Sequence, residues 1–170
     1  MIPVLALLAG CGGVAPLPKT TPTPVVAAPP PPLRSIRISY GNCYGECPIF
    51  TVTVLAGGHG KFEGEGFTRV SGERAFSVSS EQFVAVAVAL EPVRLAASVP
   101  LAKLAEGGPL CDEYRTDHPN RLIVWTEVNG EQRAMMWNTG CSAKRYEGVQ
   151  PAIDKALAVL PVGPWIAGAH

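Results

Sequence analysis

A proline-rich stretch near the start of the chain limits which residues can join a folded domain. Residues 12–33 read GGVAPLPKTTPTPVVAAPPPPL. Proline fixes φ and lacks a backbone N–H, so such a segment cannot build a core and favours an extended polyproline II conformation. At about 3.1 Å per residue, a stretch of this length would span about 60–70 Å. We therefore expect residues 11–33 to be a semi-rigid spacer in front of the folded part.

The rest of the chain fits one domain. Residues 34–160 are enough to bury about two-thirds of the extended-chain surface, and residues 161–170 form a Pro- and Gly-broken tail that Trp165 could dock on the domain. The 14 Lys and Arg balance the 14 Asp and Glu, which gives a net charge of zero. Because nucleic-acid binding requires a basic surface, no nucleic-acid partner is expected.

The residues before the spacer predict a membrane anchor. An apolar run ends in Leu8-Ala9-Gly10-Cys11, which resembles the lipobox of bacterial lipoproteins, where the cysteine becomes the lipidated first residue. The resemblance implies that residues 1–10 are the remnant of a signal peptide and that Cys11 carries fatty acyl chains such as palmitate. Gly12 stands where lipoproteins retained in the inner membrane have aspartate. The resemblance therefore implies the outer membrane, facing the periplasm.

The segment before Cys11 lacks the positive n-region of a signal peptide, and its apolar core is short. No Lys or Arg precedes Cys11, and the first basic residue is Lys19, whereas a signal peptide has a positive n-region and a longer apolar core. We expect the natural start to lie upstream of Met1. The alternative is an unprocessed cytoplasmic N-terminus in which L-A-G-C occurs by chance.

Residue patterns in the domain predict strands first. Alternating or β-branched stretches, separated by Gly57-Gly58 and Gly72, predict four strands over 35–40, 48–55, 61–68 and 73–78. Ser79 and Gln82 have the spacing of a helix-capping box, and apolar residues at helical spacing follow. Pro92 and Pro100 are expected to break up the chain after that helix.

The second half predicts a hairpin and a last helix. Leu122 to Val128 and Glu131 to Trp137 flank Asn129-Gly130, the preferred pair for a type I′ turn. A helix with Pro151 in its first turn would carry Ile153, Ala156, Leu157 and Leu160 on one face. The predicted order is four strands, helix, two strands, helix. This order favours an α+β fold, with an antiparallel sheet and the helices packed on one face.

Four cysteines remain once Cys11 is assigned to lipid: Cys43, Cys47, Cys111 and Cys141. They allow three pairings. In a two-residue hairpin on Asn129-Gly130, paired positions sum to 259, so Cys141 lies opposite about position 118, where Cys111 could fold back to meet it. The hairpin therefore predicts Cys111–Cys141 and leaves Cys43–Cys47 as the second disulfide.

The motif Cys43-Tyr44-Gly45-Glu46-Cys47-Pro48 resembles the C-[FY]-G-x-C-P signature of an uncharacterised bacterial domain that often occurs in lipoproteins. The resemblance extends over residues 35–160, and it implies no activity. Three interpretations of the loop remain open. The first is a structural disulfide. The second is a redox-active pair, although such pairs usually stand at a helix N-terminus. The third is a metal site, which needs two further ligands.

A second polar loop spans residues 111–119, where Asp117 and His118 stand next to each other among further carboxylates. The loop could hold a cation or an acid–base pair, or it could be a solvated turn closed by a disulfide. Trp125, Met135, Met136 and Trp137 on the hairpin predict core or sheet packing, or a partner-binding patch where exposed.

The sequence as a whole favours a lipid-anchored binding or structural module of the cell envelope, with the membrane and an envelope protein as partners. No residue set predicts a cofactor, a resident metal or catalysis. The alternative is a thiol-redox or metal-dependent enzyme that uses Cys43 and Cys47 or the loop around Asp117 and His118.

Overall fold

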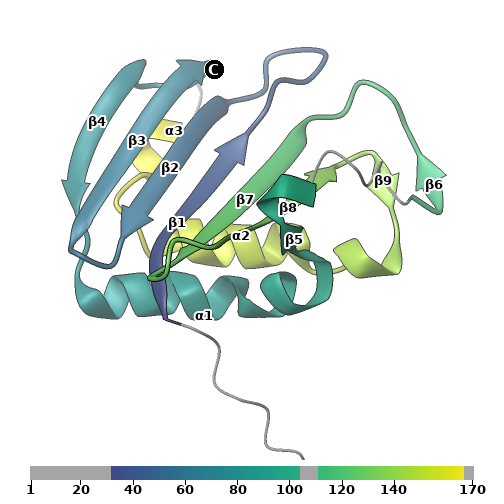
Figure 1. The fold of residues 1–170 in the computed structure, drawn as a ribbon. Helices are drawn as coiled ribbons and strands as arrows, with labels where there is room; N and C mark the ends of the chain where they lie inside the picture. The colour runs from purple at the N-terminus through teal and green to yellow at the C-terminus, as the bar shows by residue number, and fades with distance from the viewer. Residues whose placement is uncertain (1–31, 104–110, 167–170) are drawn as a thin grey trace, which may run out of the picture. The chain divides into compact units, whose positions relative to one another are not determined.

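The computed structural model describes residues 32–103 and 111–166, and they form a helix-covered antiparallel sheet (Figure 1). The strand order is β4-β3-β2-β1-β7-β8-β5. The strands of this sheet are β1 (Leu33–Tyr40), β2 (Ile49–Leu55), β3 (His59–Gly66), β4 (Gly72–Ser77), β5 (Val99–Pro100), β7 (Asn120–Glu127) and β8 (Gln132–Asn138). The mostly antiparallel sheet with a few helices agrees with the predicted α+β class.

Alternation of apolar and polar residues explains the central strands. Ile36 and Ile38 of β1 point into the core, as do Val52 and Val54 of β2, and the residues between them are more exposed. The register places Ile36 opposite Val54 and Ile38 opposite Val52. Since a shift of one residue would turn these side chains to the other face, burial fixes this register.

The first helix begins as the sequence predicts. The backbone N–H of Ser79 donates to Oε1 of Gln82 at 2.9 Å, and the backbone N–H of Gln82 donates to Oγ of Ser79 at 3.2 Å. Helix α1 (Ser80–Ala97), however, runs through Pro92, so the prediction that Pro92 breaks up the chain is wrong. Pro92 faces solvent, where water can satisfy the carbonyl that lost its N–H partner. The buried residues Val93 and Ala97 hold the last turns against the core.

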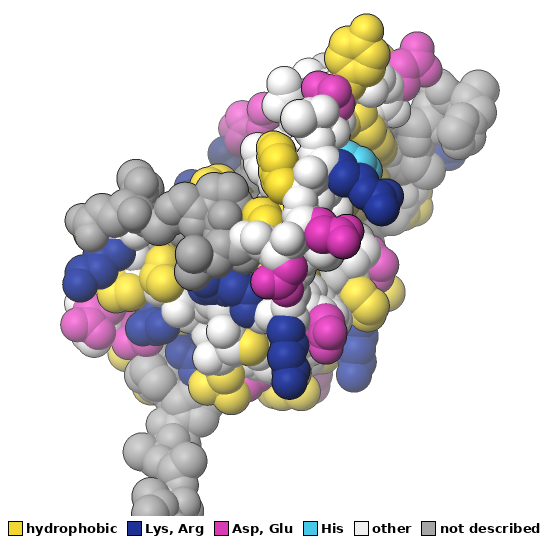
Figure 2. Space-filling view, turned by 90° about the vertical axis from the view of Figure 1, so that its right-hand side faces the viewer, with side chains coloured by type: hydrophobic (Ala, Val, Ile, Leu, Met, Phe, Trp, Pro, Cys, Tyr) yellow, Lys and Arg dark blue, Asp and Glu magenta, His cyan; other side chains and the backbone are white. Residues whose placement is uncertain are grey.

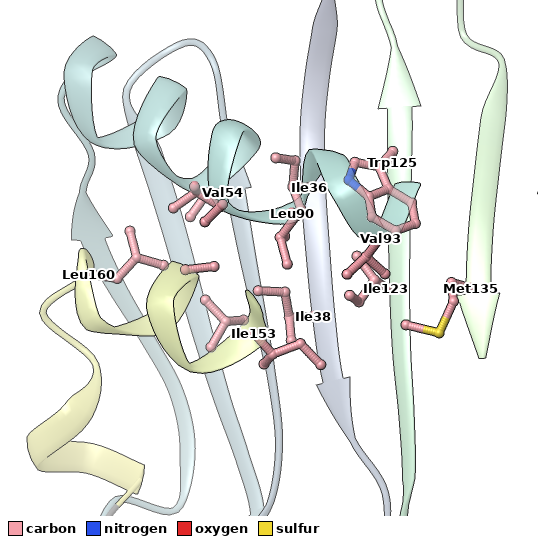
Figure 3. Packing of buried hydrophobic residues seen from close by; sticks show 14 of the residues in the cluster. Ile36, Ile38, Val54, Leu90, Val93, Ile123, Trp125, Met135, Ile153 and Leu160 are labelled. Carbon is pink, nitrogen blue, oxygen red and sulfur yellow. The ribbon is translucent and has the colours of Figure 1, made fainter. Parts of the chain in front are cut away.

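The two long helices cover one face of the sheet. Helix α2 (Val149–Ala158) packs on α1, and Nε2 of Gln82 donates to the carbonyl of Val159 at 3.0 Å. Figure 3 shows Ile38 of β1, Leu90 of α1 and Ile153 of α2 meeting between the helices and the strands. Burial of these side chains, at roughly 25 cal/mol per Å² of apolar surface, is the main stabilising term of the domain.

The predicted order of elements is incomplete. The described chain also contains the short strands β5, β6 (Glu113–Tyr114) and β9 (Cys141–Ser142), the 3₁₀ helices η1 (Leu101–Lys103) and η2 (Lys144–Tyr146), and helix α3 (Gly163–Ile166). Two-residue strands carry no periodic signal, since an alternating pattern needs at least about four residues to be recognised. Strands β6 and β9 pair only with each other and form a separate two-stranded sheet.

The predicted turn of the β7–β8 hairpin is wrong by one residue. Asn120 pairs with Asn138 and Thr126 with Gln132, so paired positions sum to 258. The backbone N–H of Glu127 donates to the carbonyl of Glu131 at 2.8 Å, which leaves a three-residue loop over 128–130. Gly130, at φ 90°, takes the left-handed position. A type I turn followed by a left-handed glycine matches the twist of the flanking strands, as a type I′ turn also does. The Asn-Gly pair therefore does not distinguish a two-residue loop from a three-residue loop.

The C-terminal residues that are described pack on the domain. Val162 is buried, and the Trp165 ring lies 5.6 Å from the Phe62 ring and 5.8 Å from the Phe76 ring, measured between centroids. The backbone N–H of Val70 donates to the carbonyl of Trp165 at 3.3 Å. Trp165 therefore docks α3 on the sheet, as expected. None of the described helices is long and apolar enough to cross a membrane.

Candidate functional site

The C-x-G-x-C-P motif forms a disulfide-closed loop between β1 and β2. Cys43 is bonded to Cys47, with 5.9 Å between their Cα atoms, and Gly45 supports the turn at φ 136°. Tyr44 at the tip is 90% exposed. The loop leads into strand β2 and not into a helix, so these cysteines lack the helix dipole that lowers the thiol pKa in reactive pairs.

The second disulfide closes the other loop. Cys111 is bonded to Cys141, with 5.2 Å between their Cα atoms and a sequence separation of 30. This is the pairing that the hairpin predicted. Next to it, β6 pairs with β9, placing Tyr114 opposite Cys141. The backbone N–H of Arg115 donates to the carbonyl of Gly140 at 2.8 Å. Together these links hold the polar loop against the end of β8.

The two loops that the sequence marked separately lie side by side. The backbone N–H of Tyr44 donates to the carbonyl of Asp117 at 3.3 Å, and the N–H of Gly41 donates to the carbonyl of Asn120 at 2.9 Å. On the other side, the N–H of Thr139 donates to the carbonyl of Pro119 at 2.9 Å. Both disulfides therefore fix loops at the same end of the sheet.

An open cleft of about 500 Å³ lies at this end, between the β6–β9 pair, the end of β8 and η2. Figure 2 faces this side of the molecule and shows acidic, basic and apolar side chains interspersed on the described surface. The residues that line the cleft are Asp112, Glu113, Arg115, His118, Trp137, Thr139, Gly140, Cys141, Ser142, Ala143, Lys144, Tyr146 and Glu147.

Trp137 is the largest apolar side chain in the cleft wall. Its Nε1–H donates to the carbonyl of Cys141 at 2.9 Å, and its ring stacks on that of Tyr146 with 6.2 Å between centroids. Trp137 is half-buried, whereas Trp125 and Met135 of the same hairpin are buried in the core. The sequence left Trp137 either as a packing residue or as part of an exposed partner-binding patch, because alternation in β8 does not show that this strand end borders a cleft.

The structure separates the side chains of Asp117 and His118. Asp117 has a left-handed φ of 65°, and its Oδ2 accepts from Oγ1 of Thr116 at 3.0 Å. The His118 ring lines the cleft, and its Nδ1 lies 3.4 Å from Oγ1 of Thr139. Within residues 32–103 and 111–166, no hydrogen bond or ion pair joins the two side chains, and no group of three or more His, Cys, Asp or Glu side chains converges as a metal site would require.

A polar cluster that the sequence missed lies at the end of β1 and β7. The Arg121 guanidinium stacks on the Tyr40 ring, with 3.7 Å from Cζ to the centroid. Nε2 of Gln150 donates to the Tyr40 hydroxyl at 2.9 Å and to Oδ1 of Asp154 at 2.7 Å. Burial raises the pKa of Tyr40 and lowers that of Arg121. The cluster joins α2 to the sheet, since Gln150 and Asp154 come from the helix.

Comparison with protein families identifies the domain. A family model described as Domain of unknown function (DUF6438) matches residues 34–157. The chain belongs to the DUF6438 family. The DUF6438 domain contains both disulfides and all residues of the cleft, which agrees with the predicted resemblance to an uncharacterised domain. No curated protein matches the chain.

Gly140 controls the shape of the cleft. A Cβ at this position would collide with the backbone carbonyl of Arg115 and press on the His118 ring. We expect Gly140→Ala to lower the free energy of unfolding by about 1–3 kcal/mol, the usual cost of overpacking, measured by urea denaturation. Gly57→Ala is the matched control, because open space surrounds a Cβ there and its φ is not left-handed. Equal stability of the two variants would contradict this account.

Proposed function

We propose that the chain is a lipid-anchored protein of the outer membrane that faces the periplasm, and that its DUF6438 domain is a binding module of the cell envelope. Residues 1–10 are the signal peptide remnant, Cys11 is the lipidated residue, and residues 12–33 are the spacer that separates domain and membrane. The observation that carries the proposal is that two disulfides fix neighbouring loops at one end of the domain.

The disulfides support both parts of the proposal. Disulfides persist in oxidising compartments such as the periplasm and are rare in the cytosol, so two of them favour an exported domain. Loops that are fixed before binding also lose less conformational entropy when a ligand arrives. The loop that the Cys111–Cys141 disulfide closes borders a cleft of about 500 Å³, which is within the usual size of ligand sites.

The side-chain geometry favours binding over the enzyme alternative. A general acid or base must lie within hydrogen-bond reach of its partner, yet Asp117 is engaged by Thr116 while His118 borders Thr139. Cys43 and Cys47 are joined in a loop that leads into a strand, a setting that leaves the thiolate unassisted. Neither proposed chemistry therefore gains support from its surroundings.

Anchoring is tested with the protein produced from its own locus with a C-terminal tag. We expect the protein to enter the detergent phase in a Triton X-114 partition and to incorporate labelled palmitate. Cys11→Ala should move it to the aqueous phase and abolish labelling, because each buried methylene of an acyl chain contributes about 0.8 kcal/mol. The double variant Cys43→Ala/Cys47→Ala, which leaves Cys11 in place, is the control and should stay in the detergent phase. A wild-type protein in the cytoplasm with all five cysteines as reduced thiols would overturn the proposal.

Binding is tested by placing a photo-crosslinking side chain at Ser142, which is exposed and lines the cleft. Irradiation of intact cells should give an adduct with envelope material. Ser80, which is exposed at the start of α1 and is not among the cleft residues, is the matched control. If Ser142 gives no adduct beyond that of Ser80, the binding role is wrong.

A further inference from the structure

The chemistry of the cleft walls points to a ligand class, and this inference rests on the proposed binding role. We propose that the cleft between the β6–β9 pair and η2 binds a neutral saccharide chain, with Trp137 as the surface on which a sugar ring stacks.

Trp137 offers its ring and not its N–H to a ligand. The Nε1–H already donates to the carbonyl of Cys141, and the ring stacks on that of Tyr146. These two contacts hold the indole in one orientation, so no side-chain ordering is required when a ligand binds. A half-buried aromatic ring with its polar atom engaged presents an apolar plane. The C–H face of a sugar ring is also flat and apolar, so it complements the plane of the indole.

The rim around this plane offers both hydrogen-bond acceptors and hydrogen-bond donors. The carboxylates of Glu113 and Glu147 accept hydrogen bonds, and the side chains of Arg115 and Lys144 donate them. Sugar hydroxyls donate and accept at once, so each can be satisfied at such a rim. An aliphatic ligand would leave these groups desolvated and unpaired, which disfavours its binding.

The charges of the cleft disfavour ionic chains. The cleft lining carries the carboxylates of Asp112, Glu113 and Glu147 and the cations of Arg115 and Lys144. A polyanion would meet three carboxylates and a polycation would meet two cations, whereas a neutral chain meets neither repulsion.

The inference is tested on the full chain carrying Cys11→Ser, which removes the acylated thiol and leaves the domain unchanged. The probe is the β-1,4-linked tetramer of N-acetylglucosamine, a neutral saccharide, and a sulfated oligosaccharide of equal length is the comparison. Binding is followed by the indole N–H signal of Trp137 in ¹⁵N–¹H spectra. We expect saturable binding of the neutral tetramer, with a shift at Trp137 and not at the buried Trp125.

Variants locate the binding surface. Trp137→Ala should raise the Kd of the tetramer by at least about tenfold, the factor that corresponds to 1.4 kcal/mol. Because Trp137→Ala also loses packing on Tyr146, Glu147→Gln provides a second variant on an exposed side chain, with an expected rise of about threefold. Tyr44→Ala, which removes an exposed aromatic outside the cleft, should leave the Kd unchanged.

Three results would overturn the inference: no saturable binding of the tetramer, equal or tighter binding of the sulfated chain, or a Kd that Trp137→Ala and Glu147→Gln leave unchanged. A protein adduct at Ser142 together with no saccharide binding would retain the binding role and reject the saccharide. Loss of membrane partition would reject the anchor and leave the titration unaffected, because the titrated chain has no acylated cysteine.

Discussion

Replacing both Cys111 and Cys141 by alanine is expected to lower the free energy of unfolding by about 3.5 kcal/mol, measured by urea denaturation at pH 7. The bond joins positions 30 residues apart, so its loss returns the entropy of a long loop to the unfolded chain. Replacing both residues avoids a free thiol at Cys141, which is buried. The loss should also loosen the cleft, because β6 and β9 pair over only two residues each.

The double variant Cys43→Ala/Cys47→Ala is the matched control. Its loop is much shorter, with a sequence separation of 4, and the expected loss is about 2 kcal/mol. Hydrogen exchange separates the two effects further. The amides of Asp112 and Arg115, which donate to Ser142 and Gly140, should exchange faster in the first variant only. An equal or larger loss in the control would show that loop entropy does not set the contribution of these bonds.

The elements with strong local signals could be predicted from the sequence. The strand pairs of the first half follow from alternation, because a half-buried strand must place every second side chain in the core. The start of α1 follows from Ser79 and Gln82, whose side chains satisfy backbone N–H groups that the helix itself leaves free. The face of α2 follows in the same way from Ile153 and Ala156, both of which are fully buried.

The errors arise where two local solutions have similar free energies. An Asn-Gly pair fits a two-residue type I′ turn or a three-residue loop with a left-handed glycine, and Gly130 takes the second solution. Proline disfavours the interior of a helix by about 3 kcal/mol, and Pro92 stands inside α1. Here Pro92 faces solvent while Val93 and Arg94 are buried, so packing outweighs the lost hydrogen bond.

The cleft could not be predicted, because it depends on contacts between segments far apart in the chain. The sequence marked Cys43, Cys47, Asp117 and His118 as chemical candidates, and the structure brings their loops together through the hydrogen bond between Tyr44 and Asp117. It did not decide whether Trp137 packs or belongs to an exposed binding patch, since nothing local shows which end of β8 borders the cleft. The close approach of Gly140 to the Arg115 carbonyl has no local signal either, because the two residues are far apart in the sequence and lie just outside the paired strands β6 and β9.

Phe50→Ala is expected to lower the free energy of unfolding by about 3–5 kcal/mol, the usual cost of removing a buried aromatic side chain. Phe50 is 1% exposed and lies in the middle of a row of rings. Its centroid is 4.5 Å from that of Tyr40 and 5.8 Å from that of Phe62, and both pairs are stacked. The loss therefore combines apolar burial, a cavity and two ring pairs of about 0.5–1.5 kcal/mol each.

Phe67→Ala is the matched control, because this ring is 52% exposed and its removal should change the free energy of unfolding by no more than about 0.5 kcal/mol. A second readout follows from Tyr40, whose pKa burial raises. A group whose pKa is raised on folding stabilises the protein below its unfolded pKa and loses this contribution as the pH rises. In Phe50→Ala, Tyr40 gains solvent on one side, so its ionisation, followed by ultraviolet absorbance, should shift to lower pH. If Phe50→Ala loses the full stability but Tyr40 ionises at an unchanged pH, then the Phe50 ring does not contribute to the burial of Tyr40.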